Sequence, residues 1–170
     1  MPSSKPNSGF TLIELLITIA ILAVLMTVTF VFVFPALAKA RDARRKFELT
    51  NLGRFLVMGC PLPSSGAGDY DLAPLIEELK AAYPRYADAL AAKPKDPSRG
   101  TEEETFYRYV VSDATGTLPK KCALYANLEN SGETVTLPGL AVPTVGGGTG
   151  VFRASADGWN GTPNYFQISN

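Results

Sequence analysis

The sequence predicts an α+β fold in which one long N-terminal helix packs on a small antiparallel β-sheet. The first observation is an apolar run over residues 10–34, in which Glu14 is the only charged residue. The second is an amphipathic pattern over residues 35–58, which continues the helix beyond this run. The third is a group of short aromatic and β-branched stretches within residues 59–170, which are typical of strands in a small globular domain.

Composition narrows the functions that the chain can have. The 170 residues contain no histidine, which is the commonest general base and transition-metal ligand. Lys plus Arg and Asp plus Glu both number 16, so no basic excess points to nucleic acid as a partner. We therefore expect a protein that is not an enzyme and that recognises no specific nucleic acid.

Residues 10–34 are long enough to cross a membrane as a helix. At about 1.5 Å per residue the run rises roughly 37 Å, and a hydrocarbon core is about 30 Å thick. The alternative is a cleaved secretory signal peptide, because Ala36-Leu37-Ala38 is a cleavage site of the right kind. The length of the run and the charge of Glu14 inside it argue against this alternative.

Glu14 needs a partner of opposite charge. An ionisable side chain at the centre of a membrane helix costs about 2.5–3.5 kcal/mol, and such residues usually have a function. No other residue between Phe10 and Phe34 can neutralise Glu14. Its partner is therefore another chain, a lipid headgroup or a positive charge created at a new N-terminus.

The polar leader Met1–Gly9, the stretch GFTLIE (Gly9–Glu14) and the apolar run after it resemble the class III signal of type IV pilins and type II secretion pseudopilins. The resemblance implies that residues 1–9 are a leader peptide, which a prepilin peptidase removes by cutting between Gly9 and Phe10. The same enzyme would then methylate the new amine of Phe10. Glu14 would pair with the N-terminal amine of a neighbouring subunit, and the fold would be type IV pilin-like.

The resemblance also implies the partners and the location of the chain. The partners are identical or related pilin subunits in a helical filament, the prepilin peptidase and an inner-membrane assembly platform. The subunit would first lie in the bacterial inner membrane, with its N-terminus inside and its globular domain outside. It would then join a periplasmic pseudopilus or a cell-surface filament that serves secretion, adhesion, motility or DNA uptake. The alternative is a secreted or membrane-anchored binding protein, not an enzyme, whose apolar run is a plain signal or anchor.

A basic cluster follows the apolar run: Lys39, Arg41, Arg44, Arg45 and Lys46. By the positive-inside rule this cluster favours the orientation opposite to the one that the resemblance implies. We expect a solvated or inter-subunit face, since no aromatic residues alternate with these charges as they would in a nucleic-acid site. Local pairs at i,i+4 spacing are expected for Asp42 with Lys46 and for Arg44 with Glu48.

In the second part of the helix, the apolar residues move from one face to the opposite face along the chain. Pro35 is expected to kink or locally melt the helix, and the segment Gly59–Pro63 is expected to end it. We expect one face to contact neighbouring subunits and the opposite face to pack on the chain's own domain. The alternative is a single surface helix with an irregular stripe. The first face holds Ala36, Ala40, Ala43 and Phe47, and the second holds Leu49, Leu52 and Leu56.

The remainder of the chain predicts a short helical region and then an antiparallel meander. Residues 70–93 have helical spacing that Pro84 interrupts. Residues 106–112 and 122–128 are rich enough in aromatic and β-branched residues to be strands, and residues 151–155 and 164–169 are weaker candidates.

Cys60 and Cys122 form a candidate disulfide, because the first lies where the long helix should end and the second opens an expected strand. A bridge would join helix to sheet and stabilise the fold by about 2–4 kcal/mol. The alternative is a pair of separate buried thiols.

Two loops contain residues that could hold a ligand. Residues 146–150 (GGGTG) lack the lysine of a phosphate loop and predict a flexible turn. Residues 155–164 loosely resemble the calcium loop of the major type II pseudopilin, with Asp157-Gly158 and Gly161-Thr162 in place. The acidic pair of that loop is absent, so Asp157 is a weak calcium candidate. We expect no cofactor and a polar loop on which Trp159 packs.

Overall fold

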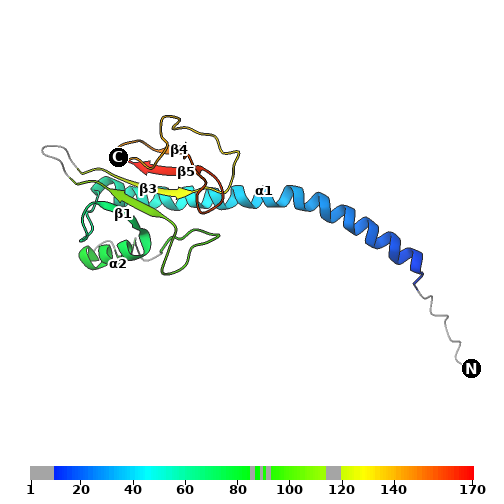
Figure 1. The fold of residues 1–170 in the computed structure, drawn as a ribbon. Helices are drawn as coiled ribbons and strands as arrows, with labels where there is room; N and C mark the ends of the chain where they lie inside the picture. Colours follow the sequence, from blue (N-terminus) through cyan, green and yellow to red (C-terminus); the bar gives the residue numbers. More distant parts are fainter. Residues whose placement is uncertain (1–9, 85–86, 89, 91–92, 114–119) are drawn as a thin grey trace, which may run out of the picture. The chain divides into compact units, whose positions relative to one another are not determined.

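The computed structural model describes residues 10–84, 87–88, 90, 93–113 and 120–170. Within these residues the elements are two helices and five strands, drawn in Figure 1. The chain divides into two compact units, Met1–Leu37 and Ala38–Asn170. Helix α1 (Leu12–Gly59) contributes its first part to one unit and its second part to the other.

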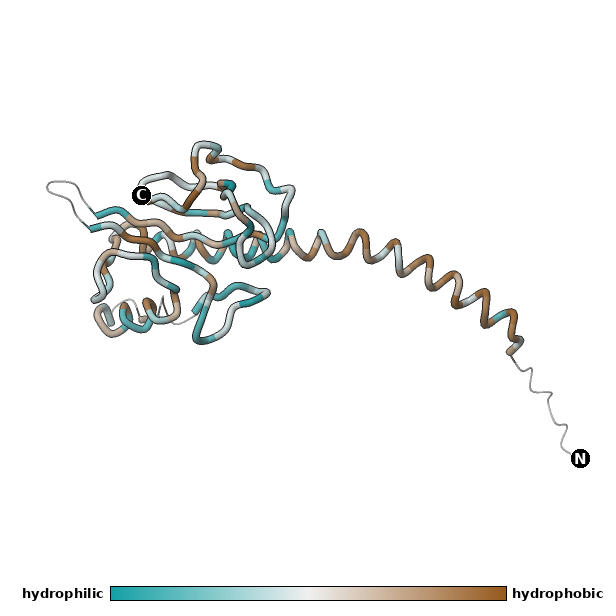
Figure 2. Tube along the Cα trace, in the orientation of Figure 1, coloured by the Kyte–Doolittle hydropathy of each residue, from teal (hydrophilic) through white to brown (hydrophobic). Residues whose placement is uncertain are grey.

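In the first unit, α1 is mostly apolar, as the predominantly brown colour in Figure 2 shows. Its large hydrophobic side chains between Leu12 and Phe34 are 43 % to 81 % exposed, and none is covered by another described part of the chain. A helix that is hydrophobic all round is usually either a core helix or a membrane span. By length and composition this segment can cross a membrane.

Helix α1 passes through Pro35 without interruption, so the expected local melting is absent. Proline removes a single backbone donor, and the hydrogen bonds on either side keep the turn helical. The helix ends at Gly59, inside the expected segment. The next residue, Cys60, has φ of +40° and donates its N–H to Leu56 O at 2.8 Å, which is a left-handed C-terminal cap.

The second unit contains one antiparallel sheet with the strand order β1-β2-β3-β5-β4. The strands are β1 (Gly68–Asp71), β2 (Arg108–Val111), β3 (Cys122–Asn127), β4 (Gly150–Arg153) and β5 (Asn164–Ser169). The expected meander is wrong in one respect, because β5 lies between β3 and β4 and pairs with both. Strand β1 was not expected at all.

Helix α2 (Leu72–Ala82) follows β1 directly, and the two lie side by side in Figure 1. Asp71 caps its first turn by accepting the N–H of Ala73 at 2.8 Å. The same carboxylate accepts the N–H groups of Thr105 and Phe106, at 2.9 and 3.0 Å, and thereby fixes the entry into β2. Within the described residues, α2 covers only Leu72–Ala82 of the helical region that was expected over residues 70–93.

The core of the second unit lies between α1, α2 and one face of the sheet. The expectation that the leucine face of α1 packs on the chain's own domain is confirmed, whereas Phe47 on the opposite face is 66 % exposed. Cys60 and Cys122 form the expected disulfide, with their Cα atoms 5.5 Å apart. The principal core residues are Leu49, Leu52, Leu56, Leu72, Ile76, Tyr107, Tyr109 and Leu124.

Candidate functional site

The start of α1 is organised by a reciprocal pair of hydrogen bonds between Thr11 and Glu14. Thr11 precedes the first helical residue, and its Oγ1 accepts the N–H of Glu14 at 3.3 Å. In return, Glu14 Oε2 accepts the N–H of Thr11 at 3.0 Å and its hydroxyl at 2.7 Å. This is a capping box, which satisfies backbone donors that have no partner inside a helix. The spacing T-x-x-E in GFTLIE is the sequence signature of this box, which the charge of Glu14 alone does not reveal.

The other carboxylate oxygen, Glu14 Oε1, accepts no hydrogen bond from the described residues, and no described cation contacts it. The neighbouring Phe10 is 74 % exposed, and Gly9 lies outside the described residues. The first unit thus presents a fully uncovered apolar helix with one carboxylate, half of whose hydrogen-bonding capacity is unused. The capping box turns the carboxylate back toward the start of the helix.

The three threonines deeper in the same helix behave differently from Thr11. Each donates its hydroxyl to a carbonyl of the preceding turn of its own helix: Thr18 to Leu15, Thr27 to Val24 and Thr29 to Leu25. These hydroxyl groups therefore need no partner from outside. Apart from Glu14, the described side chains of the apolar segment present hydrocarbon, the thioether of Met26 or locally satisfied hydroxyl groups to their surroundings.

The expected solvated face is wrong for Arg45, which lies inside the protein, whereas Lys39 and Arg44 are exposed. Arg45 is fully buried and binds Asp96 through two hydrogen bonds of 2.8 and 2.9 Å, and Asp42 through one of 2.6 Å. A third carboxylate, that of Glu129, also contacts its guanidinium. One buried cation is thus surrounded by three carboxylates from α1 and from two loops that follow it in sequence.

The neighbours of Arg45 are neutralised in the same way. Arg41 pairs with Glu129, and Lys46 pairs with Glu133. The expected pair of Arg44 with Glu48 is confirmed at 2.7 Å, but the expected pair of Asp42 with Lys46 is wrong. Asp42 instead accepts the backbone N–H groups of the loop after β3, those of Glu129 and Asn130.

The network lowers the pKa values of two of its acids, Glu129 and Asp96. Burial raises the pKa of Glu129, but hydrogen bonds from Arg41, Ser98 and Arg45 outweigh it and lower the value to about 2. Burial likewise opposes ionisation of Asp96, yet hydrogen bonds from Arg45 and Asn160 hold its pKa below the ordinary value. Both acids therefore stay charged at neutral pH. The network attaches the second part of α1 to the loops around it.

The segment that loosely resembles a calcium loop is organised by aromatic packing. Trp159 lies among Phe106, Tyr125 and Tyr165, with ring centroids 6.1, 6.4 and 5.5 Å away. Asp157 is exposed. Across the described parts of the chain, no three His, Cys, Asp or Glu side chains are grouped closely enough to hold a metal ion.

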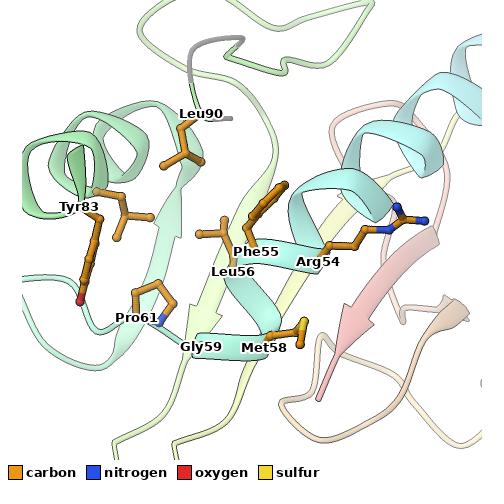
Figure 3. A pocket seen from close by; sticks show the side chains of 9 residues that line it. Arg54, Phe55, Leu56, Met58, Gly59, Pro61, Tyr83 and Leu90 are labelled. Carbon is orange, nitrogen blue, oxygen red and sulfur yellow. The ribbon is translucent and has the colours of Figure 1, made fainter. Parts of the chain in front are cut away.

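A groove of 460 Å³ opens in the second unit between the end of α1 and helix α2 (Figure 3). Among the described lining residues Arg54 is the only charged one, and in the figure its guanidinium points away from Tyr83. The described lining offers no acid, thiol or hydroxyl group other than the Tyr83 phenol, and it is mostly apolar. The lining residues are Arg54, Phe55, Leu56, Met58, Gly59, Pro61, Leu79, Tyr83 and Leu90.

Comparison with known proteins identifies the start of the chain. Residues 4–30 match the family model described as the prokaryotic N-terminal methylation motif, which is the class III signal of type IV pilins and pseudopilins. The match includes Gly9, Phe10 and Glu14, and it confirms the resemblance inferred from GFTLIE. Comparisons with curated proteins and with solved structures found no match for the chain.

Proposed function

We propose that this chain, whose start is a prokaryotic N-terminal methylation motif, is the precursor of a structural subunit of a type IV pilus-like or pseudopilus filament. Its work is assembly, with no chemistry of its own. The pilin-like architecture of one long helix on a small antiparallel sheet supports this proposal. The apolar segment of α1 anchors the precursor in the membrane and later packs with other subunits.

Processing creates a positive charge that can act as the partner of Glu14. A prepilin peptidase hydrolyses the peptide bond between Gly9 and Phe10, and the water consumed leaves a carboxylate on Gly9 and an amine on Phe10. The amine nitrogen then takes a methyl group from a sulfonium methyl donor and loses a proton. The product is a secondary amine that still carries a positive charge at neutral pH.

The observation that carries the proposal is that Glu14, in an otherwise apolar and uncovered helix, has no partner of opposite charge among the described residues. A charge in hydrocarbon is costly alone and much less costly beside an opposite charge. The amine of Phe10 in a neighbouring subunit supplies that charge when the two helices are correctly staggered. The pair therefore selects one register for each added subunit.

Two further observations fit an orientation with the globular unit outside the cytoplasm. A disulfide such as Cys60–Cys122 persists in oxidising compartments and is rare in the cytosol. The basic cluster that opposes this orientation is largely neutralised once the second unit folds, through the partners Asp96, Glu129 and Glu133.

The proposal is tested by cross-linking in membranes of cells that contain the peptidase and the assembly platform. A membrane-permeant carbodiimide joins a carboxylate to an amine in direct contact with it. We expect covalent dimers of the wild-type chain, with the cross-link mapped by mass spectrometry between Glu14 and Phe10. Glu14→Ala should insert and be cleaved as usual but give neither these dimers nor filaments. Glu103→Ala, which removes an exposed carboxylate of the second unit, is the matched control.

Normal filaments from Glu14→Ala would overturn the pairing argument. The rival function, a secreted or anchored binding protein, is separated by the N-terminus of the processed chain. An N-methylated Phe10 supports the filament subunit. A chain that begins at Lys39 would instead show that the apolar run is a cleaved signal peptide.

A further inference from the structure

We propose that Asn170 is a gate over the Cys60–Cys122 disulfide, and that a thiol which exchanges with this bond must displace Asn170 and attack Cys60. The inference goes beyond the proposed function and does not depend on it, because it concerns only groups inside the second unit. It gives a role in disulfide chemistry to Asn170, which follows β5, and to the last turn of α1.

The carboxamide of Asn170 contacts both halves of the disulfide. Its Oδ1 accepts the N–H of Cys122 at 3.0 Å, and its Nδ2 donates to Cys60 Sγ, also at 3.0 Å. Exchanging the two amide atoms would place an NH₂ group against the N–H of Cys122, so these contacts fix the orientation of the amide. Asn170 is exposed, whereas Cys60 is only 3 % exposed. The carboxamide therefore forms part of the cover on the sulfur that it contacts.

Burial distinguishes the two sulfur atoms as targets. Exchange begins when a thiolate attacks one sulfur and expels the other. Cys122 is fully buried between β3 and the end of α1, and its carbonyl oxygen accepts the hydroxyl of Ser169 at 2.9 Å. Cys60 keeps a small exposure, and an exposed side chain contacts its sulfur. Movement of Asn170 uncovers Cys60, whereas uncovering Cys122 requires separation of α1 from the sheet.

The end of α1 opposes the thiolate that this attack would expel. The carbonyl oxygen atoms of Leu56 and Val57 lie 3.6 and 3.8 Å from Cys122 Sγ. Carbonyl groups at the end of a helix carry partial negative charge, and a bridged sulfur has no proton to donate to them. A thiolate on Cys122 would therefore face negative oxygen atoms in a buried site. Both conditions disfavour the thiolate and make Cys122 a poor leaving group.

Reduction by dithiothreitol then proceeds in two balanced steps. Its first thiolate bonds to Cys60 Sγ, and the electron pair of the broken S–S bond leaves on Cys122. Its second thiolate attacks the mixed disulfide, closes the cyclic disulfide of the reductant and releases the thiolate of Cys60. The two protons that dithiothreitol lost pass through solvent to the two cysteines. Formation of the bond by exchange with another protein's disulfide follows this path in reverse, so we expect oxidation to precede docking of Asn170.

The test compares the full-length wild-type chain with Asn170→Ala and Asn51→Ala in a mild detergent, each with its disulfide formed. Asn51→Ala is the matched control, because Asn51 is an exposed amide about 13 Å before Cys60 along α1. The rate of reduction by dithiothreitol is followed by alkylation of the free thiols and mass spectrometry. A parallel reaction with glutathione, stopped by alkylation, maps the sulfur that carries the mixed disulfide. The rates are also measured in urea below the unfolding midpoint.

We expect Asn170→Ala to be reduced about tenfold faster than the wild type, because it lacks the two hydrogen bonds that keep the gate closed. The faster rate should change little with urea, since a local opening exposes little surface. Glutathione should be found on Cys60 and the alkyl group on Cys122. Asn51→Ala should react at the wild-type rate.

A wild-type rate for Asn170→Ala would overturn the gate, and glutathione on Cys122 would overturn the choice of the attacked sulfur. Equal acceleration in Asn51→Ala would also overturn the gate, as would a rate that rises with urea in parallel with global unfolding. In both cases a general loss of stability would explain the result. None of these outcomes depends on filament assembly, so the proposed function would stand.

Discussion

Replacement of Arg45 by methionine should strongly destabilise the second unit. Methionine fills a similar volume but carries no charge, so Asp42, Asp96 and Glu129 would face one another without their shared cation. Removing one partner of a buried ion pair typically costs about 3–5 kcal/mol, because the remaining charge stays uncompensated. Small domains have about 5–15 kcal/mol of stability in total, so this single change removes a large share.

The effect should depend on pH with a defined sign. In the wild-type chain the pKa values of Asp96 and Glu129 are lowered. These groups stabilise the fold above their unfolded pKa, near 4, and the contribution is lost as pH falls through the folded value, about 2 for Glu129. In Arg45→Met the buried carboxylates prefer the neutral form, so folding takes up protons. The stability difference between the two chains should therefore shrink as pH falls from 7 toward 4.

The assay is urea unfolding of the full chain in a mild detergent, followed by the fluorescence of Trp159, the single tryptophan. With a slope of about 1–3 kcal/mol per molar urea, the midpoint should fall by more than about 1 M. Arg44→Met is the matched control, because the side chain of Arg44 is 62 % exposed and exposed pairs contribute about 0–1 kcal/mol. Equal midpoint shifts in the two variants, or a difference that widens at low pH, would refute the reasoning.

Two further predictions concern the disulfide and one close backbone contact. The double variant Cys60→Ala/Cys122→Ala should lose about 2–4 kcal/mol of unfolding free energy, and its urea midpoint should no longer respond to reductant. Gly158→Ala should cost about 1–3 kcal/mol, because a Cβ atom there would overlap the Tyr165 hydroxyl and the Asn127 side chain. Gly139→Ala, where a Cβ meets nothing within 4 Å, should stay within about 0.5 kcal/mol of the wild type in the same assay.

The elements that could be predicted from sequence are those governed by local pattern. The apolar run, the leucine face of α1 and the four strands that contain aromatic residues were all anticipated, because helix and strand signals are properties of neighbouring residues. Strand β1 was missed because its four residues, GDYD, have little apolar character. Its position depends on pairing with β2 across a long intervening segment, which no local pattern records.

The network around Arg45 could not be predicted for the same physical reason. Asp96 and Glu129 lie 51 and 84 residues away from Arg45 along the chain, so only the tertiary fold brings them together. Sequence reasoning assigned local i,i+4 partners, and it was right for Arg44 and wrong for Lys46. A surface pair gains little energy, whereas a buried guanidinium must find several acceptors. The long-range partners therefore outweighed the nearest one.

The short stretch GFTLIE shows how one set of residues can serve successive stages of assembly. Under the proposed function, Glu14 is an acid without a partner of opposite charge until the bond before Phe10 is cut. The structure adds that Thr11 donates two hydrogen bonds to one of its oxygens, Oε2, and so caps the start of the helix. This cap does not compete with the proposed charge pair, because Oε1 accepts no hydrogen bond from the described residues. Under the proposed function, the same carboxylate can therefore cap its own helix before processing and pair with the new amine afterwards.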